Sequence, residues 1–140
     1  MTMTADTPMT GRGWSIAIWG GQIALAALYL MAAWMHGTLS PEEMAKMGAV
    51  WALTAPIVLV RSIGVAEFLG VLGLILPAAT RIKPGLTVLA AIGLLAIQVL
   101  AVPFHISRGE WFALPFNLIY VALTLFVIWG RTRKAPISAR

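Results

Sequence analysis

Two ionisable side chains lie inside one of the most apolar stretches of this chain. The segment RSIGVAEFLG (61–70) carries Arg61 and Glu67 among residues otherwise suited to lipid. An ionised side chain at the centre of a spanning helix costs roughly 2.5–3.5 kcal/mol on insertion scales, so such residues usually face a protein interior and have a function. Arg61 lies about one turn inside the helix start, and its side chain leans toward the outer surface, where it can snorkel. Glu67 lies deeper and therefore requires a polar neighbour or a proton.

The neighbour of Glu67 is expected to come from another segment. Arg61 and Glu67 are separated by about 120° around a helix, so direct pairing between them is awkward. We expect Glu67 to meet His105, Gln98, Tyr29 or Asn117. An outward-opening cavity would then be lined by polar residues of all four helices. The candidate ligand-binding residues are Glu67, His105, Gln98, Asn117, Arg61, His36, Tyr29 and Tyr120.

The histidines raise the question of a metal or haem. His36 by itself is interpreted first as an interfacial polar residue, whereas His105 follows Pro103 and shares a helix face with Gln98. Haem ligation by the two histidines is disfavoured, because histidines inside a bundle need no cofactor. There is no Glu-x-x-His pair, G-x-S-x-G, P-loop or dinucleotide fingerprint. We therefore predict no metal site and assign no catalytic residue, and whether the chain is an enzyme stays open.

Four apolar segments are long enough, or nearly so, to cross a bilayer as helices. They are 14–35, 57–76, 86–104 and about 113–130. Between the first two, SPEEMAKMGAVWAL (40–53) has Ser40, Pro41 and Glu43 in a capping-box pattern. We interpret 40–53 as a short amphipathic helix at the membrane surface, with an ordinary surface connector as the alternative.

Each apolar segment has one face that mixes polar and small residues. Gln22, Tyr29 and His36 recur at intervals of seven, and Asn117 and Thr124 do the same. The simplest arrangement turns these faces inward. The predicted fold class is therefore an all-α integral membrane four-helix bundle with a short amphipathic helix between helices one and two. For Gln22, Thr124 and Tyr29 we favour a structural hydrogen-bond network over a ligand site.

Composition and charge support a membrane protein. The chain is 60% hydrophobic and only 11% charged, and it has no cysteine. The net charge of +5 does not indicate nucleic acid, because the basic residues concentrate in particular loops and the tail. Their asymmetry predicts a multi-pass protein of the inner (plasma) membrane with both termini cytoplasmic. We expect a disordered segment 1–13, a membrane domain 14–130 and a basic cytoplasmic tail 131–140.

Residues 61–110 resemble the DoxX-like family of small four-helix membrane proteins. The likeness rests on Arg61-x-x-Gly64-x-x-Glu67, on Leu76-Pro77 before a basic turn, and on an alanine-rich third helix that ends in His105. A more distant likeness is to NACHO, an animal chaperone for ion-channel assembly. The resemblance implies association with membrane redox systems in some relatives, and it assigns no catalytic role to Arg61, Glu67 or His105.

Three functions are compatible with these observations. The first is a redox-associated accessory subunit that binds a quinone or another lipid-like molecule in the bundle; because cysteine is absent, electrons would come from such a quinone or a partner's cofactor. The second is a non-enzymatic assembly or scaffold protein that docks partner membrane proteins. The third is a transporter or channel, which four helices without internal repeats would build only as an oligomer. The sequence leaves open the ligand, the partner, the oligomeric state and the protonation of Glu67.

Overall fold

The computed structural model describes residues 11–140, and this part of the chain contains helices and no strands. Its four long helices are α1 (Gly11–Thr38), α3 (Ile57–Thr80), α4 (Gly85–Ser107) and α5 (Leu114–Trp129). Shorter elements connect or extend them: α2 (Pro41–Lys46), η1 (Val50–Leu53), η2 (Trp111–Ala113) and the π-helical turn η3 (Gly130–Lys134). The all-helical prediction with four apolar helices is confirmed.

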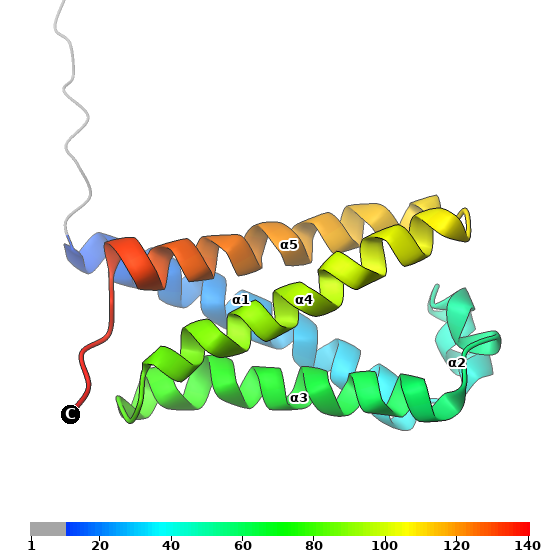
Figure 1. Cartoon of the computed structure of the whole chain (residues 1–140), viewed down its shortest axis with the longest axis horizontal. Helices are drawn as coiled ribbons and strands as arrows, with labels where there is room; N and C mark the ends of the chain where they lie inside the picture. The colour runs from blue at the N-terminus through cyan, green and yellow to red at the C-terminus, as the bar shows by residue number, and fades with distance from the viewer. Residues whose placement is uncertain (1–10) are drawn as a thin grey trace, which may run out of the picture.

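The long helices run alternately up and down (Figure 1). α1 packs against α3 and α5, and α4 packs against the same two helices, which closes a four-helix bundle. The start of α1 and the C-terminus lie at one end of the bundle, which we call the terminal end. The other end, which carries α2, η1 and the α4–α5 connection, is called the α2 end.

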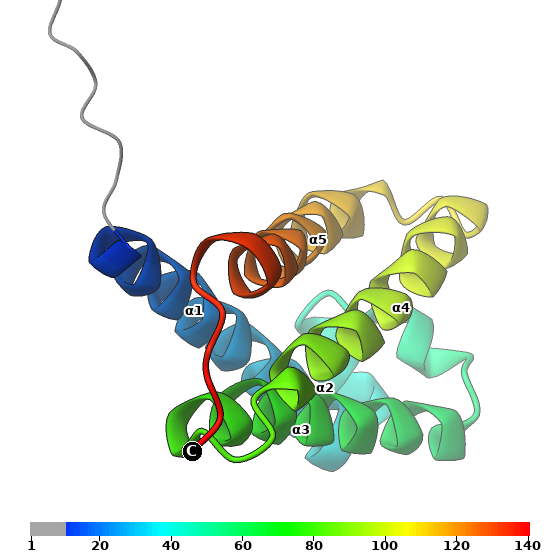
Figure 2. The same cartoon turned by 60° about the vertical axis from the view of Figure 1, so that its left-hand side comes forward.

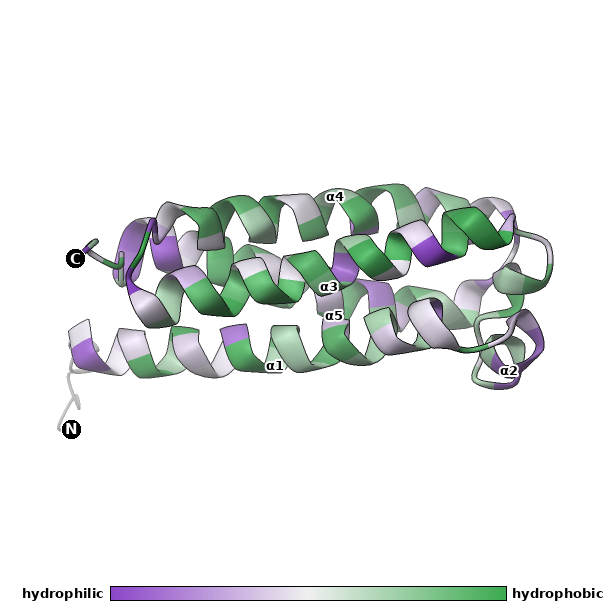
Figure 3. Cartoon of the chain, turned by 90° about the horizontal axis from the view of Figure 1, so that it is seen from below, coloured by the Kyte–Doolittle hydropathy of each residue, from purple (hydrophilic) through white to green (hydrophobic). Residues whose placement is uncertain are grey.

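All four spans are long and apolar enough to cross a bilayer, counting η2, α5 and η3 as one helical stretch from Trp111 to Lys134. Figure 3 shows the long helices mostly hydrophobic along their length, with hydrophilic residues at the ends and at a few interior positions. Large apolar residues such as Val58 and Leu100 are exposed in the isolated chain. Such faces suit contact with acyl chains, because lipid is as apolar as leucine.

The helix boundaries extend beyond the predicted ones. α1 begins at Gly11, so residues 11–13 are helical, and residues 1–10 of the expected disordered segment lie outside the described part of the chain. α3 continues past Leu76 through Pro77 to Thr80. Proline loosens the preceding turn, but side chains can re-satisfy backbone groups there. The carbonyl of Leu74 accepts Gln22 Nε2 at 2.6 Å and Thr87 Oγ1 at 3.4 Å.

The predicted single helix over 40–53 is interrupted. Ser40 forms the expected capping box with Glu43, and α2 begins at Pro41. The hydrogen bonds from the backbone and side chain of Ser40 lower the pKa of the exposed Glu43 carboxyl. Gly48 then adopts φ +100°, a left-handed conformation that glycine adopts readily, and the chain resumes as the 3₁₀ turn η1. Met44 of α2 is fully buried.

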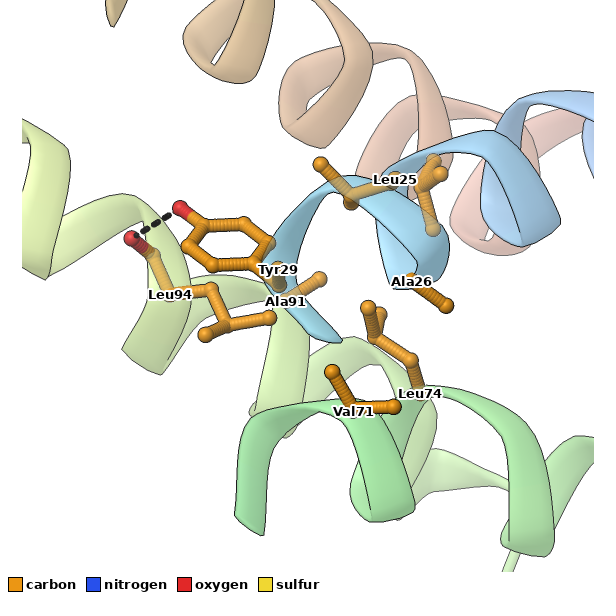
Figure 4. Close-up of a cluster of buried hydrophobic side chains, with 8 residues drawn as sticks. Leu25, Ala26, Tyr29, Val71, Leu74, Ala91 and Leu94 are labelled. Atoms are coloured by element: carbon orange, nitrogen blue, oxygen red, sulfur yellow. Dashed lines mark hydrogen bonds between the residues drawn. The ribbon is translucent and has the colours of Figure 1, made fainter. Parts of the chain in front are cut away.

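The core lies where α1, α3 and α4 meet. Figure 4 shows Leu25, Ala26 and Tyr29 of α1 against Val71 and Leu74 of α3 and Ala91 and Leu94 of α4. The Tyr29 hydroxyl donates to the Leu94 carbonyl at 3.0 Å, so the tyrosine is buried without an unsatisfied hydroxyl. This bond supports the structural interpretation of Tyr29, and together with the apolar contacts it fixes the middle of the bundle.

Candidate functional site at the α2 end

The three residues of the motif Arg61-x-x-Gly64-x-x-Glu67 all contact one residue of α1, His36. His36 Nδ1 and Glu67 Oε2 are 2.7 Å apart, and Arg61 Nη1 donates to the His36 carbonyl at 2.6 Å. A Cβ atom on Gly64 would lie 3.1 Å from the His36 carbonyl carbon and 2.8 Å from the Gly37 nitrogen. Glycine is therefore required for the two helices to approach this closely. Three positions on one face of α3 thus contact the side chain, the carbonyl and the backbone of His36.

The His36–Glu67 pair is buried within the apolar spans. Glu67 is 3% exposed and His36 is 8% exposed. Hydrogen bonding between them supplies each polar group with a partner, which burial requires. Removing one member of a buried pair typically costs about 3–5 kcal/mol, because the other is left unpaired. A histidine and a carboxylate at this distance can share a proton and pass it on.

These contacts correct three expectations. The hydrogen-bond partner of Glu67 is His36, so the prediction of His105, Gln98, Tyr29 or Asn117 is wrong. His36, interpreted first as an interfacial polar residue, is buried, and its ring is paired with Glu67. Arg61 does not simply extend to the surface: besides the His36 carbonyl it bonds the Leu39 carbonyl at 2.9 Å. A cation is favourable there, because the last carbonyls of a helix carry partial negative charge.

A second polar group lies deeper between the helices. Asn117 Nδ2 donates to Gln98 Oε1 at 2.7 Å, which joins α5 to α4. The Tyr29 and Tyr120 rings pack edge to face at 4.6 Å between centroids, and the Tyr120 hydroxyl donates to the Leu28 carbonyl at 3.0 Å. Both tyrosines lie within electrostatic range of Glu67. The structure therefore places these four predicted residues between the helices, with the two tyrosines near Glu67.

His105 belongs to a separate cluster. Its Nδ1 lies 2.7 Å from Glu110 Oε2, and Arg108 Nε donates to Glu110 Oε1 at 2.8 Å. Desolvation raises the pKa of the Glu110 carboxyl, but the hydrogen bonds and charges of Arg108 and His105 outweigh it, so the net pKa is lowered. This cluster fastens the connection between α4 and α5, and the predicted contact between His105 and Glu67 does not form.

A row of rings runs between the two histidines. The centroid distances are 5.5 Å from His36 to Trp51, 6.1 Å from Trp51 to Phe104 and 5.6 Å from Phe104 to His105, all edge to face. Trp51 comes from η1, so the connector segment takes part in the site. Neither Trp51 nor Glu110 was among the predicted site residues. Glu110 could have been found from its position five residues after His105, with Gly109 between them to turn the chain.

A hollow of about 400 Å³ opens beside this network. It lies on the lipid-facing side of α3 and is lined by Ile57, Val58, Arg61, Ser62 and Val65. Its walls are apolar, and Arg61 and Ser62 supply polar groups. A hollow of this kind suits an amphiphile with a small polar head. Among the described residues, no three His, Cys, Asp or Glu side chains gather as a metal site would require.

Comparison with known proteins agrees with these motifs. No curated protein and no solved structure matches the chain significantly. The sequence profile of the DoxX-like family matches residues 21–127, a range that includes most of α1, the whole Arg61–Glu67 motif and the His105–Glu110 cluster. With the four apolar spans, this makes the chain a multi-pass membrane protein that belongs to the DoxX-like family.

Proposed function

We propose that this protein is a redox-associated accessory subunit that binds a quinone or a similar lipid-like molecule at the α2 end. The observation that carries the proposal is the hollow at Arg61 and Ser62, because Arg61 also donates a hydrogen bond to the carbonyl of His36, the partner of Glu67. The head group would lie against these polar side chains, and the tail would follow Val58 and Val65 into the bilayer. The hollow lies on the exposed side of α3, which differs from the expected outward-opening cavity lined by all four helices.

Reduction of a quinone to a quinol consumes two electrons and two protons. Electrons would come from a redox cofactor of a partner protein. The His36–Glu67 pair supplies what this chain can contribute, namely a buried, hydrogen-bonded acid and base. Arg61 links the two parts, because its guanidinium lines the hollow and also bonds the His36 carbonyl.

Binding is tested with the purified full chain and a short-chain benzoquinone. Intrinsic tryptophan fluorescence reports occupancy, since Trp51 contacts His36. Ser62→Phe fills the hollow and is expected to weaken binding about tenfold, equivalent to about 1.4 kcal/mol. Leu100→Phe, on an exposed face of α4, is the matched control and should bind like the wild type. Equal affinity of all three proteins would refute the hollow as the binding site.

Proton handling is tested with Glu67→Gln, which keeps a hydrogen-bonding side chain but removes the carboxylate. The variant should bind the benzoquinone yet reduce it more slowly with a chemical reductant. Glu42→Gln, on the exposed surface of α2, removes the same charge and should change neither property. Equal reduction rates for the two variants would leave Glu67 a purely structural role.

Docking of a membrane partner is the second candidate function. It is favoured by Met47, Val50 and Leu53, which stay exposed on the α2–η1 segment although they are apolar. A binding protein without chemistry would contain no extractable quinone and would be unaffected by Ser62→Phe. Polar substitution of Leu53 would instead release a defined co-purifying membrane protein.

A further inference from the structure

A second hollow lies at the terminal end, far along the bundle from the site described above. Its volume is about 470 Å³. The start of α1, the end of α3, η3 and residues 135–137 form its walls. In Figure 2 the C-terminal segment runs from the end of α5 across to the end of α3, with the start of α1 on its other side. A pocket of this size accommodates a small molecule or a lipid headgroup.

Three basic side chains line this pocket: Arg81, Arg131 and Lys134. Further basic residues at the same end are Arg12, Lys83, Arg133 and Arg140, whereas the carboxylates of the described residues, Glu42, Glu43, Glu67 and Glu110, belong to the α2 half of the bundle. The pocket therefore has a positive potential that no nearby side-chain carboxylate of the described residues neutralises. Such a potential attracts anions.

Arg131 has an incomplete set of hydrogen bonds although it is only 5% exposed. Its Nε donates to Gln22 Oε1 at 2.8 Å, and its guanidinium carbon lies 4.8 Å from the centre of the Trp19 ring. Its Nη2 is buried without a hydrogen-bond partner. An unpaired buried donor on a cation is costly, and an anionic oxygen is the partner that guanidinium groups bind best.

The rest of the pocket is mostly apolar. Trp19, Ala78 and Ile137 line it together with Ser15 and the basic groups. The bonds that hold the C-terminal segment over it include Arg81 Nε to the Ser138 carbonyl at 2.9 Å, Arg131 Nη1 to the Ala135 carbonyl at 3.4 Å, and the Arg140 nitrogen to the Arg81 carbonyl at 3.1 Å. Polar and apolar walls together match a molecule that joins a phosphate to hydrocarbon.

We propose that this pocket binds the phosphate of an anionic phospholipid headgroup. The pocket lies where the apolar spans end, which is the height of the headgroup layer. Basic pockets between spanning helices at such a height are suited to anionic lipid headgroups. The phosphate contacts Arg81 and Lys134 and completes the hydrogen bonding of Arg131, and the glycerol lies against Trp19 and Ile137. This site is independent of the quinone site at the other end.

The test uses the full chain in detergent and measures lipid binding by native mass spectrometry. Phosphatidylglycerol should bind and phosphatidylcholine should not compete with it. The double variant Arg81→Gln, Lys134→Gln should bind phosphatidylglycerol at least tenfold more weakly. The matched control Arg133→Gln, Lys83→Gln loses the same charge at the same end but does not line the pocket, and its affinity should stay within twofold of the wild type.

Ala79→Trp provides a second arm that keeps every charge, because Ala79 is an exposed residue of the pocket wall. It should also abolish binding while leaving the helical content unchanged by circular dichroism. Equal losses in the two double variants would mean diffuse surface attraction and would overturn the proposal. Full displacement of the lipid by millimolar inorganic phosphate would make free phosphate the ligand and would overturn the lipid assignment.

Discussion

At the residue scale, the unusual polar residues of α3 are explained by one residue of α1. Arg61, Gly64 and Glu67 all contact His36, through its carbonyl, its backbone and its ring. The sequence predicted that Glu67 must have a partner inside the protein. It did not predict which partner. Helical spacing shows which residues share a face of one helix, but it does not determine how far a neighbouring helix is shifted along that face. The position of α1 along α3 depends on Gly64, and the role of this glycine follows from its contacts with α1 in the folded structure.

Gly64→Ala tests this explanation. The new Cβ would approach the Gly37 nitrogen to 2.8 Å, so the backbones must separate. Overpacking of this kind costs about 1–3 kcal/mol, and the variant should unfold at correspondingly lower denaturant concentration. Gly93→Ala on α4 is the matched control, because a methyl group there would have no neighbour within 4 Å and alanine favours a helix. Equal stability of the two variants would contradict the close contact.

At the element scale, the segments that connect the long helices contribute contacts to the fold and the site that their apolar patterns did not indicate. The capping box at Ser40 was readable from the sequence, because it depends on residues three apart. The break at Gly48 and the docking of Trp51 beside His36 were not, since they depend on tertiary contacts. The connection between α4 and α5 is held in a similar way by a short-range cluster, Glu110 with His105 and Arg108.

The Glu110 cluster predicts an acid-sensitive connection. The pKa of Glu110 is lowered in the folded state, relative to an ordinary glutamate value of about 4.3. Its ionised form therefore adds stability above that value, and this contribution is lost as pH falls through the folded pKa. The protection factors of residues 105–113 in hydrogen exchange, which are corrected for the intrinsic pH dependence of amide exchange, should fall on acidification in the wild type.

Glu110→Gln is expected to exchange faster already at neutral pH and to change less on acidification. The control is Glu42→Gln, whose carboxylate lies on the exposed surface of α2. It should reproduce the wild-type profile. Protection factors at 105–113 that do not change with pH in the wild type would contradict a stabilising role for the Glu110 carboxylate.

At the scale of the whole molecule, apolar length and inward polar faces predicted the four-helix bundle correctly. Each of the four spans is near the predicted place, although α1 and α3 run further than expected. Composition alone could not locate the two hollows, because both are formed by segments whose final positions depend on folding. The start of α1 and the C-terminus lie at the basic end, so the positive-inside rule predicts that this end faces the cytoplasm.

Single-cysteine labelling tests this orientation on a chain that has no native cysteine. Glu42→Cys at the α2 end should react with a membrane-impermeant maleimide in intact cells. Lys83→Cys at the terminal end should react only after the cells are permeabilised. Both positions are exposed, so differences in labelling report sidedness rather than burial. The reverse pattern would invert the protein in its membrane.

The three contacts of α3 with His36 also limit how the bundle can move. One-turn sliding of α3 along α1, about 5.4 Å, would detach Arg61 and Glu67 together and drive a larger side chain into the place of Gly64. α1 and α3 therefore move as one rigid pair. If the bundle opens to admit a ligand between its helices, α4 and α5 are the helices that move, because they bury a smaller share of their spans.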